Sequence, residues 1–548
     1  MKKVPFNQIV PFEDIRQLLG SCRERFGDRT AFEQRVGRDQ ARATTYAQFA
    51  DQVEALAAAL DRQGWADKRI AVLGENSYPW ALTYFAVLYL GAVIVPLDKE
   101  LSPEQMAEAL TRAQAKVLVH TLTYAEEAEQ AARLAGGVAL VSMEPRGQAL
   151  SLPELVERGM RAVSQGADVL AERPLDRDAP CAILFTSGTT GRSKGVTLSQ
   201  RNLAANARMA CQLVTYRPDD VMLSILPMHH TYEAMAGLLC PLYYGACVAF
   251  CPGPKALPAC LKLFAPTVMV LVPLYVQTLH RRIWQEAAKR GLEGKLRLGI
   301  GLCNALAKIG VDLRGRVLRA AREGLGGRLR LIICGGSALD PALIPPYRDL
   351  GVQILQGYGI TECSPIISAN RNRYNRDGSV GPIPPLCQVR FDEAGQLMVK
   401  GPHVMLGYWQ DESATREAFR DGWFLTGDLG YQDADGFLYI TGRCKDLIVL
   451  KNGKNILPQQ VEAPLVAQDI VAEAVVKAQQ GEEGLMAVIY PEPALSAGMT
   501  DEALRQAVQR AVDAANEQLA YYQRVRAFTL RDTPFEKTTT QKIMRYRV

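Results

Sequence analysis

Residues 183–202 read ILFTSGTTGRSKGVTLSQRN, and the rest of the chain can be placed relative to this stretch. An apolar run of strand character leads into a loop rich in glycine and hydroxyl side chains, which also carries Arg192 and Lys194. Glycines let the backbone approach a phosphate closely, and hydroxyls, amides and cations bind it, so the loop suits a polyphosphate. It is not a Walker A loop, because the required Gly-Lys-Ser/Thr spacing is absent. Taken alone, the same composition also describes an ordinary surface turn.

The sequence on both sides of this loop alternates short apolar runs with helical patterns. Between residues 46 and 60 apolar residues recur with the spacing of one helix face. Short strand-like runs such as RIAVLG, AKVLVHT, CAILFT, TVMVLVP and RLIICGG follow, separated by helical segments, up to about residue 390. This alternation predicts the α/β class, with parallel-rich sheets flanked by helices.

Beyond residue 390 the pattern changes. Asp435-Gly436 and Asn452-Gly453 are turn pairs that favour short β-hairpins, which predicts a β-rich distal part. After residue 443 a helix near 460, two strands, a helix over 501–519 and a last strand predict a small α+β domain. We therefore expect a large N-terminal domain over residues 1–444 and a small C-terminal domain over residues 445–548.

Composition excludes several classes of protein. The 548 residues exceed what one core usually organises, and 48% hydrophobic with 22% charged residues is typical of a soluble globular protein. The net charge of +5 comes without a long basic block, which argues against nucleic-acid binding. Twelve scattered cysteines and five histidines show no metal-ligand spacing, so we expect free thiols in a reducing cytoplasm and no structural metal.

Two apolar stretches need separate interpretation. The N-terminus, MKKVPFNQIVPFEDIRQ, has no apolar core before its acidic residues and is not expected to be a signal peptide. Residues 80–97 are nearly long enough to span a bilayer, but Gly91 and Pro96 interrupt them. A buried helix followed by a strand is the better interpretation.

The segment TSGTTGRSKG at residues 186–195 resembles the phosphate-loop signature of the adenylate-forming enzymes, which include acyl-CoA synthetases, peptide-synthetase adenylation domains and firefly luciferase. The family's other motifs follow in order across nearly the whole chain. They are LPMHHTYE (226–233), CGGSALDP (334–341), QGYGITE (356–362), GWFLTGDLG (422–430), ITGRCKDLIVLKNGKN (440–455) and PFEKTTTQKIMR (534–545). The combination is far more specific than any one motif.

Some of these residues suit nucleotide chemistry on their own account. Tyr358 offers a flat aromatic face for a purine, Thr361 a hydroxyl for phosphate, and Glu362 a carboxylate for Mg²⁺. Asp428 is able to accept both hydroxyls of a ribose. Other features have an ordinary reading: a His-His pair at a strand end is more often structural, and Glu233 is a structural candidate.

The resemblance implies a role for each matching position. Lys542 corresponds to the catalytic lysine, Thr361 and Glu362 to phosphate and Mg²⁺ binding, and His230 to the histidine beside the acyl carboxylate. The residues matched to ATP and AMP binding are Thr186, Ser187, Gly188, Thr189, Thr190, Gly191, Lys194, Gly335, Gly336, Ser337, Gln356, Gly357, Tyr358, Asp428, Ile440 and Arg443. Lys445 corresponds to the hinge, and Asn452, Gly453 and Lys454 to the lining of the CoA channel.

One departure from the family pattern concerns the catalytic lysine. Gln541 stands where the family usually has glycine before Lys542. A glycine permits backbone conformations that glutamine rarely adopts, so the presentation of Lys542 is in question. Without the resemblance, a lysine this close to the C-terminus would be read as part of a solvated tail.

The implied activity has two steps. A carboxylic acid first attacks ATP to give acyl-AMP and pyrophosphate, and a thiol then displaces AMP, with the small domain rotating about Lys445 between the steps. The segment between Pro273 and Gly335 resembles the insertion of long-chain fatty acyl-CoA synthetases, which points to a fatty acid substrate. This helical, basic and apolar segment suits an acid entry or a membrane surface, and equally a solvated cover with snorkelling arginines.

The expectations are therefore an AMP-forming fatty acid:CoA ligase with ATP and CoA as co-substrates, Mg²⁺ as cofactor and a cytoplasmic location. A peripheral membrane contact and a homodimer are left open. The alternatives are a fatty acyl-AMP ligase that loads an acyl carrier protein, a catalytically impaired acyl- or nucleotide-binding homologue, and a luciferase-like oxygenase. The long insertion argues against the oxygenase, and the retained motif residues argue against lost catalysis.

Overall fold

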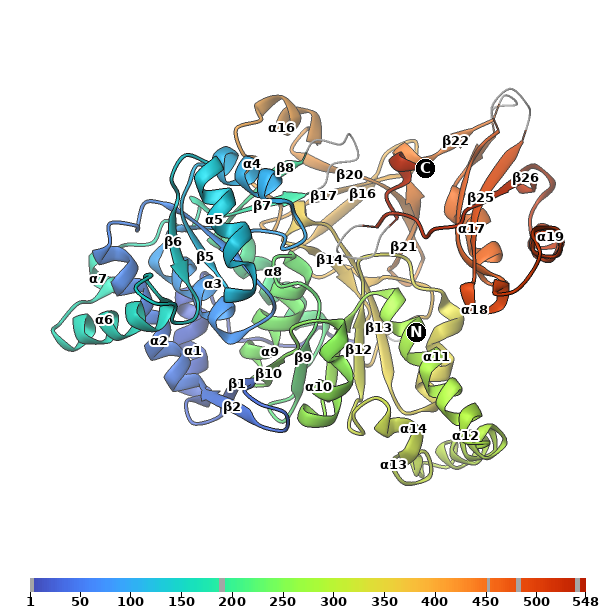
Figure 1. Cartoon of the computed structure of the whole chain (residues 1–548), viewed down its shortest axis with the longest axis horizontal. Coiled ribbons are helices and arrows are strands. Elements are labelled where there is room, and N and C mark those ends of the chain that lie inside the picture. The colour runs from blue at the N-terminus through green and yellow to red at the C-terminus, as the bar shows by residue number, and fades with distance from the viewer. Residues whose placement is uncertain (1–3, 187–192, 451–453, 480–483, 538–542) are drawn as a thin grey trace. The chain divides into compact units, whose positions relative to one another are not determined.

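The computed structural model describes residues 4–186, 193–450, 454–479, 484–537 and 543–548 (Figure 1). By internal contacts the chain divides into two compact units. Unit 1 comprises Met1–Val389, Val399–Phe424 and Ala434–Phe437. Unit 2 comprises Arg390–Met398, Leu425–Asp433 and Leu438–Val548.

Unit 1 contains a seven-stranded sheet in the order β18-β8-β7-β4-β3-β5-β6. Its strands are β3 Arg69–Leu73, β4 Val93–Pro96, β5 Ala115–His120, β6 Ala139–Ser142, β7 Pro180–Thr186, β8 Lys194–Ser199 and β18 Gly407–Tyr408. The strands from β7 to β6 pair in parallel, whereas β8 pairs antiparallel to both β7 and β18. Successive residues Ile70, Ala71 and Val72 are all buried, so both faces of the sheet are covered, as expected for parallel strands.

The second sheet of unit 1 has eight strands in the order β14-β13-β12-β11-β9-β10-β1-β2. They are β1 Thr30–Arg35, β2 Ala41–Thr45, β9 Val221–Ser224, β10 Cys247–Phe250, β11 Val268–Leu271, β12 Leu331–Cys334, β13 Gln353–Gly359 and β14 Ile366–Ala369. All inner pairs are parallel, and only the two edge pairs, β13–β14 and β1–β2, are antiparallel. The two sheets confirm the predicted α/β class.

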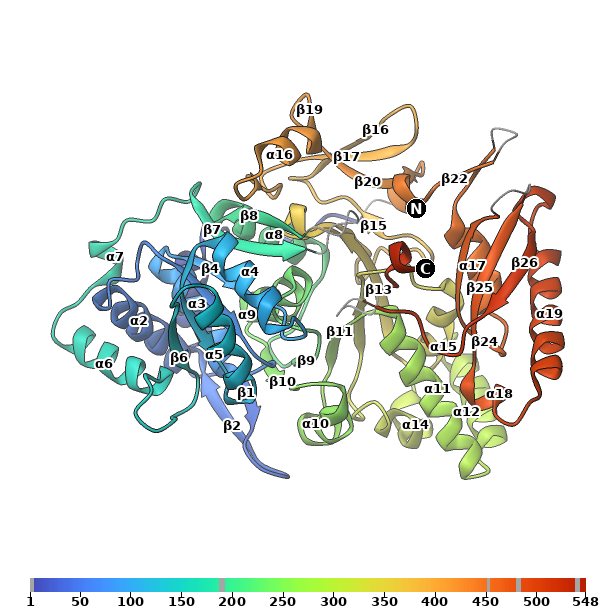
Figure 2. The ribbon, with the colours of Figure 1, turned by 45° about the horizontal axis from the view of Figure 1, so that its top comes forward.

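Helices cover these sheets and fill the space beside them. Their bounds are α1 Ile15–Phe26, α2 Tyr46–Arg62, α3 Tyr78–Leu90, α4 Pro103–Ala113, α5 Ala125–Leu134, α6 Leu152–Ser164, α7 Val169–Glu172, α8 Gln200–Leu213, α9 Cys240–Tyr243, α10 Leu257–Phe264, α11 Pro273–Lys289, α12 Glu293–Ala307, α13 Arg314–Val317, α14 Arg319–Glu323, α15 Ile344–Asp349 and α16 Glu412–Ala418. Helices α2 and α6 lie side by side (Figure 2). They cross at Gly159, where a Cβ would come within 1.7 Å of the Ala55 carbonyl oxygen, so this crossing requires glycine.

The apolar stretch over residues 80–97 is a helix and a strand, as predicted. Helix α3 begins after the N-cap Ser77 and ends at Gly91, whose positive φ of 88° terminates it in a left-handed conformation. All its residues from Trp80 to Leu90 are buried, which explains an apolar sequence without helical periodicity. No helix in the described part of the chain is long and apolar enough to cross a membrane.

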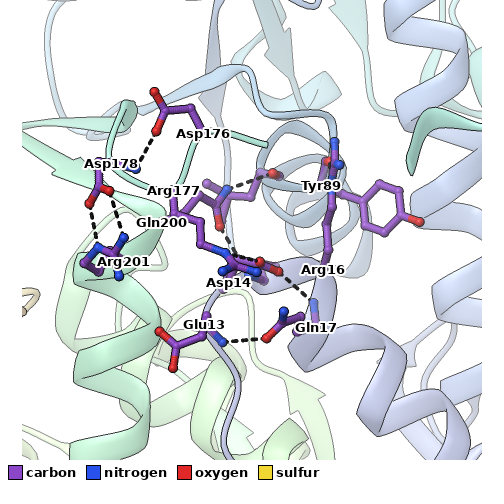
Figure 3. Close-up of polar contacts among 12 residues, drawn as sticks. Glu13, Asp14, Arg16, Gln17, Tyr89, Asp176, Arg177, Asp178, Gln200 and Arg201 are labelled. Atoms are coloured by element: carbon purple, nitrogen blue, oxygen red, sulfur yellow. Dashed lines mark hydrogen bonds and ion pairs between the residues drawn. The ribbon is translucent and has the colours of Figure 1, made fainter. Parts of the chain in front are cut away.

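A polar network ties the start of α1 to the start of α8, which directly follows β8 (Figure 3). Asp14 caps α1 by accepting from the Gln17 backbone N–H at 2.8 Å, and its second oxygen accepts from Arg177 Nε at 2.8 Å. Gln200, the first residue of α8, accepts from the Ile15 N–H at 3.2 Å and donates to the Leu88 carbonyl at 2.8 Å. The two bonds of Gln200 are buried and hold the start of α8, which directly follows β8.

Unit 2 contains the hairpin of β20 (Trp423–Gln432) and β21 (Phe437–Arg443), together with parts of β16 (Gln388–Phe391) and β17 (Gln396–Lys400). The chain crosses between the two units within these strands. The turn between β20 and β21 includes Gly436 at a φ of 89°, where the Asp-Gly pair was predicted. A short hairpin of β22 (Ile448–Val449) and β23 (Asn455–Ile456) surrounds residues 451–453.

The C-terminal part of unit 2 has its own core. Strands β24 (Val471–Ala478), β25 (Leu485–Pro491) and β26 (Val525–Leu530) form a three-stranded sheet with antiparallel and parallel pairs. Helices α17 (Pro458–Val466) and α19 (Asp501–Glu517) pack on it through Val461, Leu465, Val508 and Val512. These elements confirm the predicted helix–strand–strand–helix–strand order.

Candidate active site

A cation from one sheet and a carboxylate from the other meet at Tyr408. The Lys194 Nζ lies 4.5 Å from the Tyr408 ring centroid, a cation–π distance. The Tyr408 hydroxyl donates a hydrogen bond of 2.9 Å to Glu362 Oε1. Burial, followed by the nearby Glu362 carboxylate, raises the pKa of Tyr408, so its hydroxyl remains a donor. The three side chains therefore form one continuous polar arrangement within unit 1.

The seven-stranded sheet fixes Lys194. It is the first residue of β8 and pairs with Thr186, the last residue of β7, whose hydroxyl donates to the Lys194 carbonyl at 3.4 Å. Gly195 follows, and a Cβ there would lie 3.2 Å from both Ile183 and Trp409. Both ends of the glycine-rich loop are thus held by strand pairing. The expected phosphate ligands Ser187, Gly188, Thr189, Thr190 and Gly191 lie outside the described residues.

The eight-stranded sheet fixes Glu362. Strand β13 ends at Gly359, and a 3₁₀ turn over Thr361–Cys363 follows. The Glu362 carbonyl accepts from the Met405 N–H at 2.8 Å, and Asn206 of α8 donates to the Cys363 carbonyl at 3.0 Å. Because Met405 leads directly into β18, the same short segment carries both Tyr408 and the support of Glu362.

The residues around Glu362 suit one kind of metal ion. Among the described residues no group of three or more histidine, cysteine or acidic side chains is placed to hold a metal. Mg²⁺ needs no such cage, since it is commonly held by one or two carboxylates together with substrate phosphates. Glu362 is half-buried and accepts from Tyr408 through one oxygen, which leaves its second oxygen for a cation. This donor set fits Mg²⁺ bound with a nucleotide.

An apolar cavity of about 70 Å³ lies beside these residues, and we call it the sheet cavity. Its walls include Gly335 after β12, Gly357 and Tyr358 of β13, and Tyr232. A Cβ on Gly335 would lie 3.1 Å from the Tyr232 ring, and Tyr232 is held by a 3.0 Å hydrogen bond to the Ile333 carbonyl. Glycine at 335 therefore keeps the space open. Gly336, at a φ of 84°, also lines the cavity, whereas the neighbouring Ser337 is exposed.

Two half-buried histidines precede the wall residue Tyr232 in the sequence. Burial lowers the pKa of His229 and of His230 to about 3, so both imidazoles are neutral at pH 7. Their ring centroids are 4.1 Å apart. The His229 Nε2 lies 3.7 Å from Asp98 Oδ2, but a neutral imidazole forms no ion pair there.

Glu233 begins a π-helix over Glu233–Leu239 and is fully buried. Burial raises its pKa to about 8, with the Ser224 hydroxyl opposing the shift. The side chain therefore carries a proton at pH 7. Gly237, four residues on, leaves room for it, since a Cβ there would lie 2.4 Å from Glu233 Oε1. A π-helix of this length is uncommon and often marks a functional region.

Gln356, on strand β13, is also buried. Its side-chain Oε1 has no hydrogen-bond partner among the described residues. A buried amide oxygen without a partner is costly in free energy unless something else donates to it. Gly359, three residues on, has no space for a side chain, because a Cβ would meet the Pro365 carbonyl oxygen at 2.1 Å.

The predicted ribose ligands lie together in unit 2. Asp428 and Arg443 are direct partners in the β20–β21 pairing, and Arg443 Nε lies 3.0 Å from Asp428 Oδ1. The Asp428 carboxylate is 4% exposed and Arg443 35% exposed, so the pair presents a half-open polar edge. Ile440 pairs with Gly430 on the same two strands.

The predicted hinge and thiol-channel residues follow directly. Lys445 is exposed on the 3₁₀ turn Cys444–Asp446. The Lys454 Nζ lies 4.0 Å from the Tyr522 ring centroid, and the Lys454 carbonyl accepts from Leu450 at 2.9 Å to close the β22–β23 hairpin. Asn452 and Gly453 lie outside the described residues.

Lys542 and Gln541 also lie outside the described residues, but the chain on both sides of them is held. Lys537 pairs with Ile543, and the Met544 N–H donates to the Glu536 carbonyl at 2.9 Å. Lys537 forms a 2.5 Å ion pair with Glu473 of β24, and Arg545 binds the buried Glu462 of α17. Residues 538–542 thus connect two anchored ends.

Comparisons with known proteins agree with this arrangement. The sequence pattern of the AMP-binding enzymes matches residues 21–409, and that of the AMP-binding enzyme C-terminal domain matches residues 445–548. The chain belongs to the AMP-binding enzyme family.

Several proteins are similar in sequence to this AMP-binding enzyme over most of its length. It is 33% identical over 544 residues to the long-chain-fatty-acid–CoA ligase FadD15 of Mycobacterium bovis, covering 91% of this chain and 89% of that protein. It is 31% identical to the indoleacetate–CoA ligase of Aromatoleum aromaticum, covering 82% and 84%. The ATP-bound structure of MatB from Rhodopseudomonas palustris superposes with a TM-score of 0.76 at 25% identity, covering 97% and 98%.

Sequence reasoning missed part of this enzyme's site. Tyr408 links Lys194 to Glu362, yet the segment LGYW at residues 406–409 was not singled out. Arg112, at the end of α4, was missed too, although it donates to the Ser193 carbonyl at 2.8 Å and accepts from Trp409 Nε1 at 3.0 Å through its own carbonyl. The only sequence signal for Tyr408 is an aromatic pair after glycine, which is far too common to locate a site.

Proposed function

We propose that this enzyme activates a fatty acid with ATP to give acyl-AMP and pyrophosphate, and then transfers the acyl group to CoA. The observation that carries the proposal is the Lys194–Tyr408–Glu362 arrangement, which joins a cation and a carboxylate from two sheets beside an apolar cavity. Nucleotide phosphates need cations, and a fatty acid needs an apolar wall. The names of the relatives, which include fatty-acid and aryl-acid CoA ligases, support the same reaction class.

The first step is governed by crowded negative charge. The carboxylate oxygen attacks the α-phosphorus of ATP, and the bond to pyrophosphate breaks. Fixed donors and cations that match the developing charge lower the barrier for such transfers. We assign Lys194, Thr186, Ser187, Thr189 and Thr190 to the β- and γ-phosphates, and Lys542 to the attacking carboxylate and the α-phosphate.

Mg²⁺ would be held by Glu362 together with the phosphates, with Thr361 beside it. When bound, the ion neutralises phosphate charge. The chain's own contribution is to orient Glu362, which it does through the Tyr408 hydroxyl and the Met405 N–H.

The adenosine has two sets of assigned residues, one for the adenine and one for the ribose. We assign Tyr358 and the backbone at Gly335, Gly336, Ser337 and Gly357 to the adenine, with Gln356 supplying a buried carbonyl oxygen that lacks a partner among the described residues. That oxygen suits a donor such as an exocyclic amine. Asp428 and Arg443, already paired at 3.0 Å, are assigned to the ribose, with Ile440 beside them.

The carboxyl end of the acyl group would lie at the sheet cavity. Its walls offer no charged side chain among the described residues, and His230, two residues before the wall residue Tyr232, is neutral and adds no charge. The long insertion and the ligases of long-chain fatty acids among the relatives support a long-chain acid.

The second step requires a different arrangement of the chain. We propose that residues 445–548 form a mobile domain that turns about Lys445. In one orientation Lys542 serves the adenylating step, and in the other Asn452, Gly453 and Lys454 border the thiol channel. Domain rotation of this kind lets one site serve two reactions.

A surface of the insertion supports a peripheral membrane contact in addition. Leu298 and Ile309 are 77% and 74% exposed, and Leu302 is 53% exposed. Exposed apolar side chains among basic residues are typical of helices that lie in a membrane interface. Flotation with vesicles containing anionic lipid, compared with Leu298→Ser/Leu302→Ser, tests this contact: unchanged flotation of the variant would remove it.

The deciding experiment follows pyrophosphate and acyl-CoA with ATP, Mg²⁺ and saturated fatty acids of increasing length, with and without CoA. CoA-dependent turnover that peaks at long chains is expected. Pyrophosphate without acyl-CoA, together with transfer to an added acyl carrier protein, would favour the carrier-loading alternative. The absence of both products with every acid would favour the impaired binding homologue.

A further inference from the structure

A second hollow lies outside the sheets, among helices α11, α12 and α15, and we call it the helix groove. Its volume is about 540 Å³, within the range of small-molecule pockets. The apolar walls are formed by Ile283, Trp284, Leu296, Ile300, Pro346 and Leu350. None of these residues belongs to the site described above.

One wall of the helix groove is a fixed aromatic ledge. The Trp284 Nε1–H donates to His280 Nε2 at 2.9 Å, and the His280 ring packs 6.1 Å from the Tyr347 ring. Tyr347 is in turn anchored by a 2.6 Å hydrogen bond to the Val276 carbonyl. Burial lowers the pKa of His280, so its ring stays neutral and keeps accepting from Trp284. The ledge is therefore a preformed apolar surface.

The lining of the groove contains one cation, Arg297, which forms no ion pair with a carboxylate among the described residues. The Arg297 guanidinium lies 4.9 Å from the Trp284 ring centroid, and no acidic side chain in the described part of the chain pairs with it. The acidic residue of the lining, Asp349, has its Oδ1 hydrogen-bonded by the Asn304 side chain at 2.8 Å, while Arg314 Nε donates to the Asp349 backbone carbonyl at 3.1 Å. Arg297 is thus the charge that remains for a ligand.

The segment around the groove is the basic part of the molecule. Residues 281–330 hold thirteen lysines and arginines and four acidic residues, a net charge of +9, whereas the whole chain carries only +5. The remaining 498 residues therefore carry a net charge of −4. A local field of this sign concentrates anions at the groove.

We propose that the helix groove binds a free fatty acid, with the alkyl chain along the aromatic ledge and the carboxylate on Arg297. The apolar walls disfavour a strongly hydrated ligand, and the single cation of the lining, beside Trp284, matches a single anionic head group. Choosing a fatty acid among anionic amphiphiles rests on the proposed function. The groove would hold the substrate outside the catalytic cavity.

The test is photolabelling of the full-length protein without ATP or CoA. The probe is a fatty acid with a diazirine near the end of its alkyl chain, used below its micelle concentration, and labelled peptides are mapped by mass spectrometry. We expect label on peptides of α11, α12 and α15, lost when unlabelled palmitate is added in excess. Label confined to the peptides around Tyr232 and Tyr358 would overturn the proposal.

Two charge variants on α12 distinguish binding in the groove from a general effect of the positive charge around it. Arg297→Glu should weaken groove labelling by about tenfold or more, because a charge-assisted contact is replaced by repulsion. Lys295→Glu makes the same charge change two residues earlier on α12, where the side chain does not line the groove, and should leave labelling within about twofold. Equal loss in both variants would show a field effect rather than a site. Ile300→Trp, which fills the groove, should abolish the label, and its retention would overturn the proposal.

The source of the ligand and the proposed function are tested separately. Label that appears only when vesicles are added would assign the groove to bilayer lipid and overturn the proposal for a free acid. Acyl-CoA formation is measured on the same preparations. Absence of groove labelling in the unsubstituted protein, with intact CoA ligation, would sink the groove alone, whereas groove labelling without any ligation would sink the proposed function.

Discussion

The sheet cavity and the helix groove are both apolar hollows of unit 1, but they are built differently. The sheet cavity is formed by strand ends and by glycines such as Gly335 that have no space for a side chain. Glu233, one residue after the wall residue Tyr232, is buried, and Glu233 and the half-buried His230 are both neutral. The helix groove is walled by side chains of α11 and α12, and its cation Arg297 is exposed. The first hollow is rigid and tightly determined, whereas the second is open and tolerant.

This difference suits the sheet cavity to catalysis and the helix groove to binding an alkyl chain. Groups that act on charge in a transition state need fixed geometry and exclusion of water, which strand ends and buried residues supply. A hollow that only holds an alkyl chain needs area and one cation. Substitutions in the two regions should therefore have different consequences, and four experiments follow, from the largest expected effect to the smallest.

The largest effect should come from removing the lysine of the chemical step. Lys542→Ala should lower pyrophosphate release by about a hundredfold or more, since a cation at the reacting phosphate is lost. Thioester formation from supplied acyl-AMP should change little, and fatty-acid labelling of the helix groove should not change. Rapid-quench assays of the two half-reactions measure this. Equal loss in both half-reactions would contradict the assignment of Lys542 to adenylation and with it the domain rotation.

A smaller loss is expected where the chain orients a ligand of the metal. Tyr408→Phe keeps the ring under Lys194 but removes the 2.9 Å hydrogen bond to Glu362, and should raise the Mg²⁺ concentration for half-maximal rate by about tenfold. Glu362→Gln should raise it further. Tyr431→Phe, at an exposed tyrosine in unit 2, serves as the control. An unchanged Mg²⁺ dependence in both site variants would remove this arrangement from metal binding.

Much of the fold and part of the candidate site could be predicted from the sequence. Periodicity located β7 and α2, and the Asp435-Gly436 pair located the β20–β21 turn, because local backbone preferences decide both. Tyr408 was missed because its role depends on β18 pairing with β8, more than 200 residues earlier in the chain. The helix groove was missed for a similar reason. Its ledge joins α11 to α15, and no local pattern reports such a contact.

The buried carboxyl of Glu233 predicts a pH dependence of stability. Its pKa is about 8 in the folded protein against 4.5 for the ordinary group, so the folded state keeps a proton that the unfolded chain releases. Stability should therefore fall as pH rises through this window and level off above pH 8. The Glu233→Gln variant carries no such proton. Its free energy of unfolding should therefore rise relative to that of the wild type by about 1.4 kcal/mol per pH unit between roughly pH 5.5 and 7.5.

Urea unfolding of both proteins at three pH values measures this difference. Glu293→Gln, at the exposed start of α12, controls for the loss of one carboxylate. If the difference in free energy of unfolding between Glu233→Gln and the wild type stays constant across the pH range, the folded protein does not hold Glu233 protonated. The description of Glu233 as a neutral group would then be wrong.

The smallest effects should come from adding a single methyl group to an exposed glycine of α12 and to a glycine in the wall of the sheet cavity. A Cβ added to Gly301 of α12 would meet no atom within 4 Å, so Gly301→Ala should stabilise the protein by about 0.5–1 kcal/mol through helix propensity alone. Gly335→Ala instead forces the Tyr232 ring, 3.1 Å from the new Cβ, to move, and should lower kcat/KM for long acids without any gain in stability. Thermal unfolding and a fatty-acid series measure both. Gly335→Ala with full activity would mean that the sheet cavity adapts as freely as the helix groove, and the contrast between a rigid and a tolerant hollow would then fail.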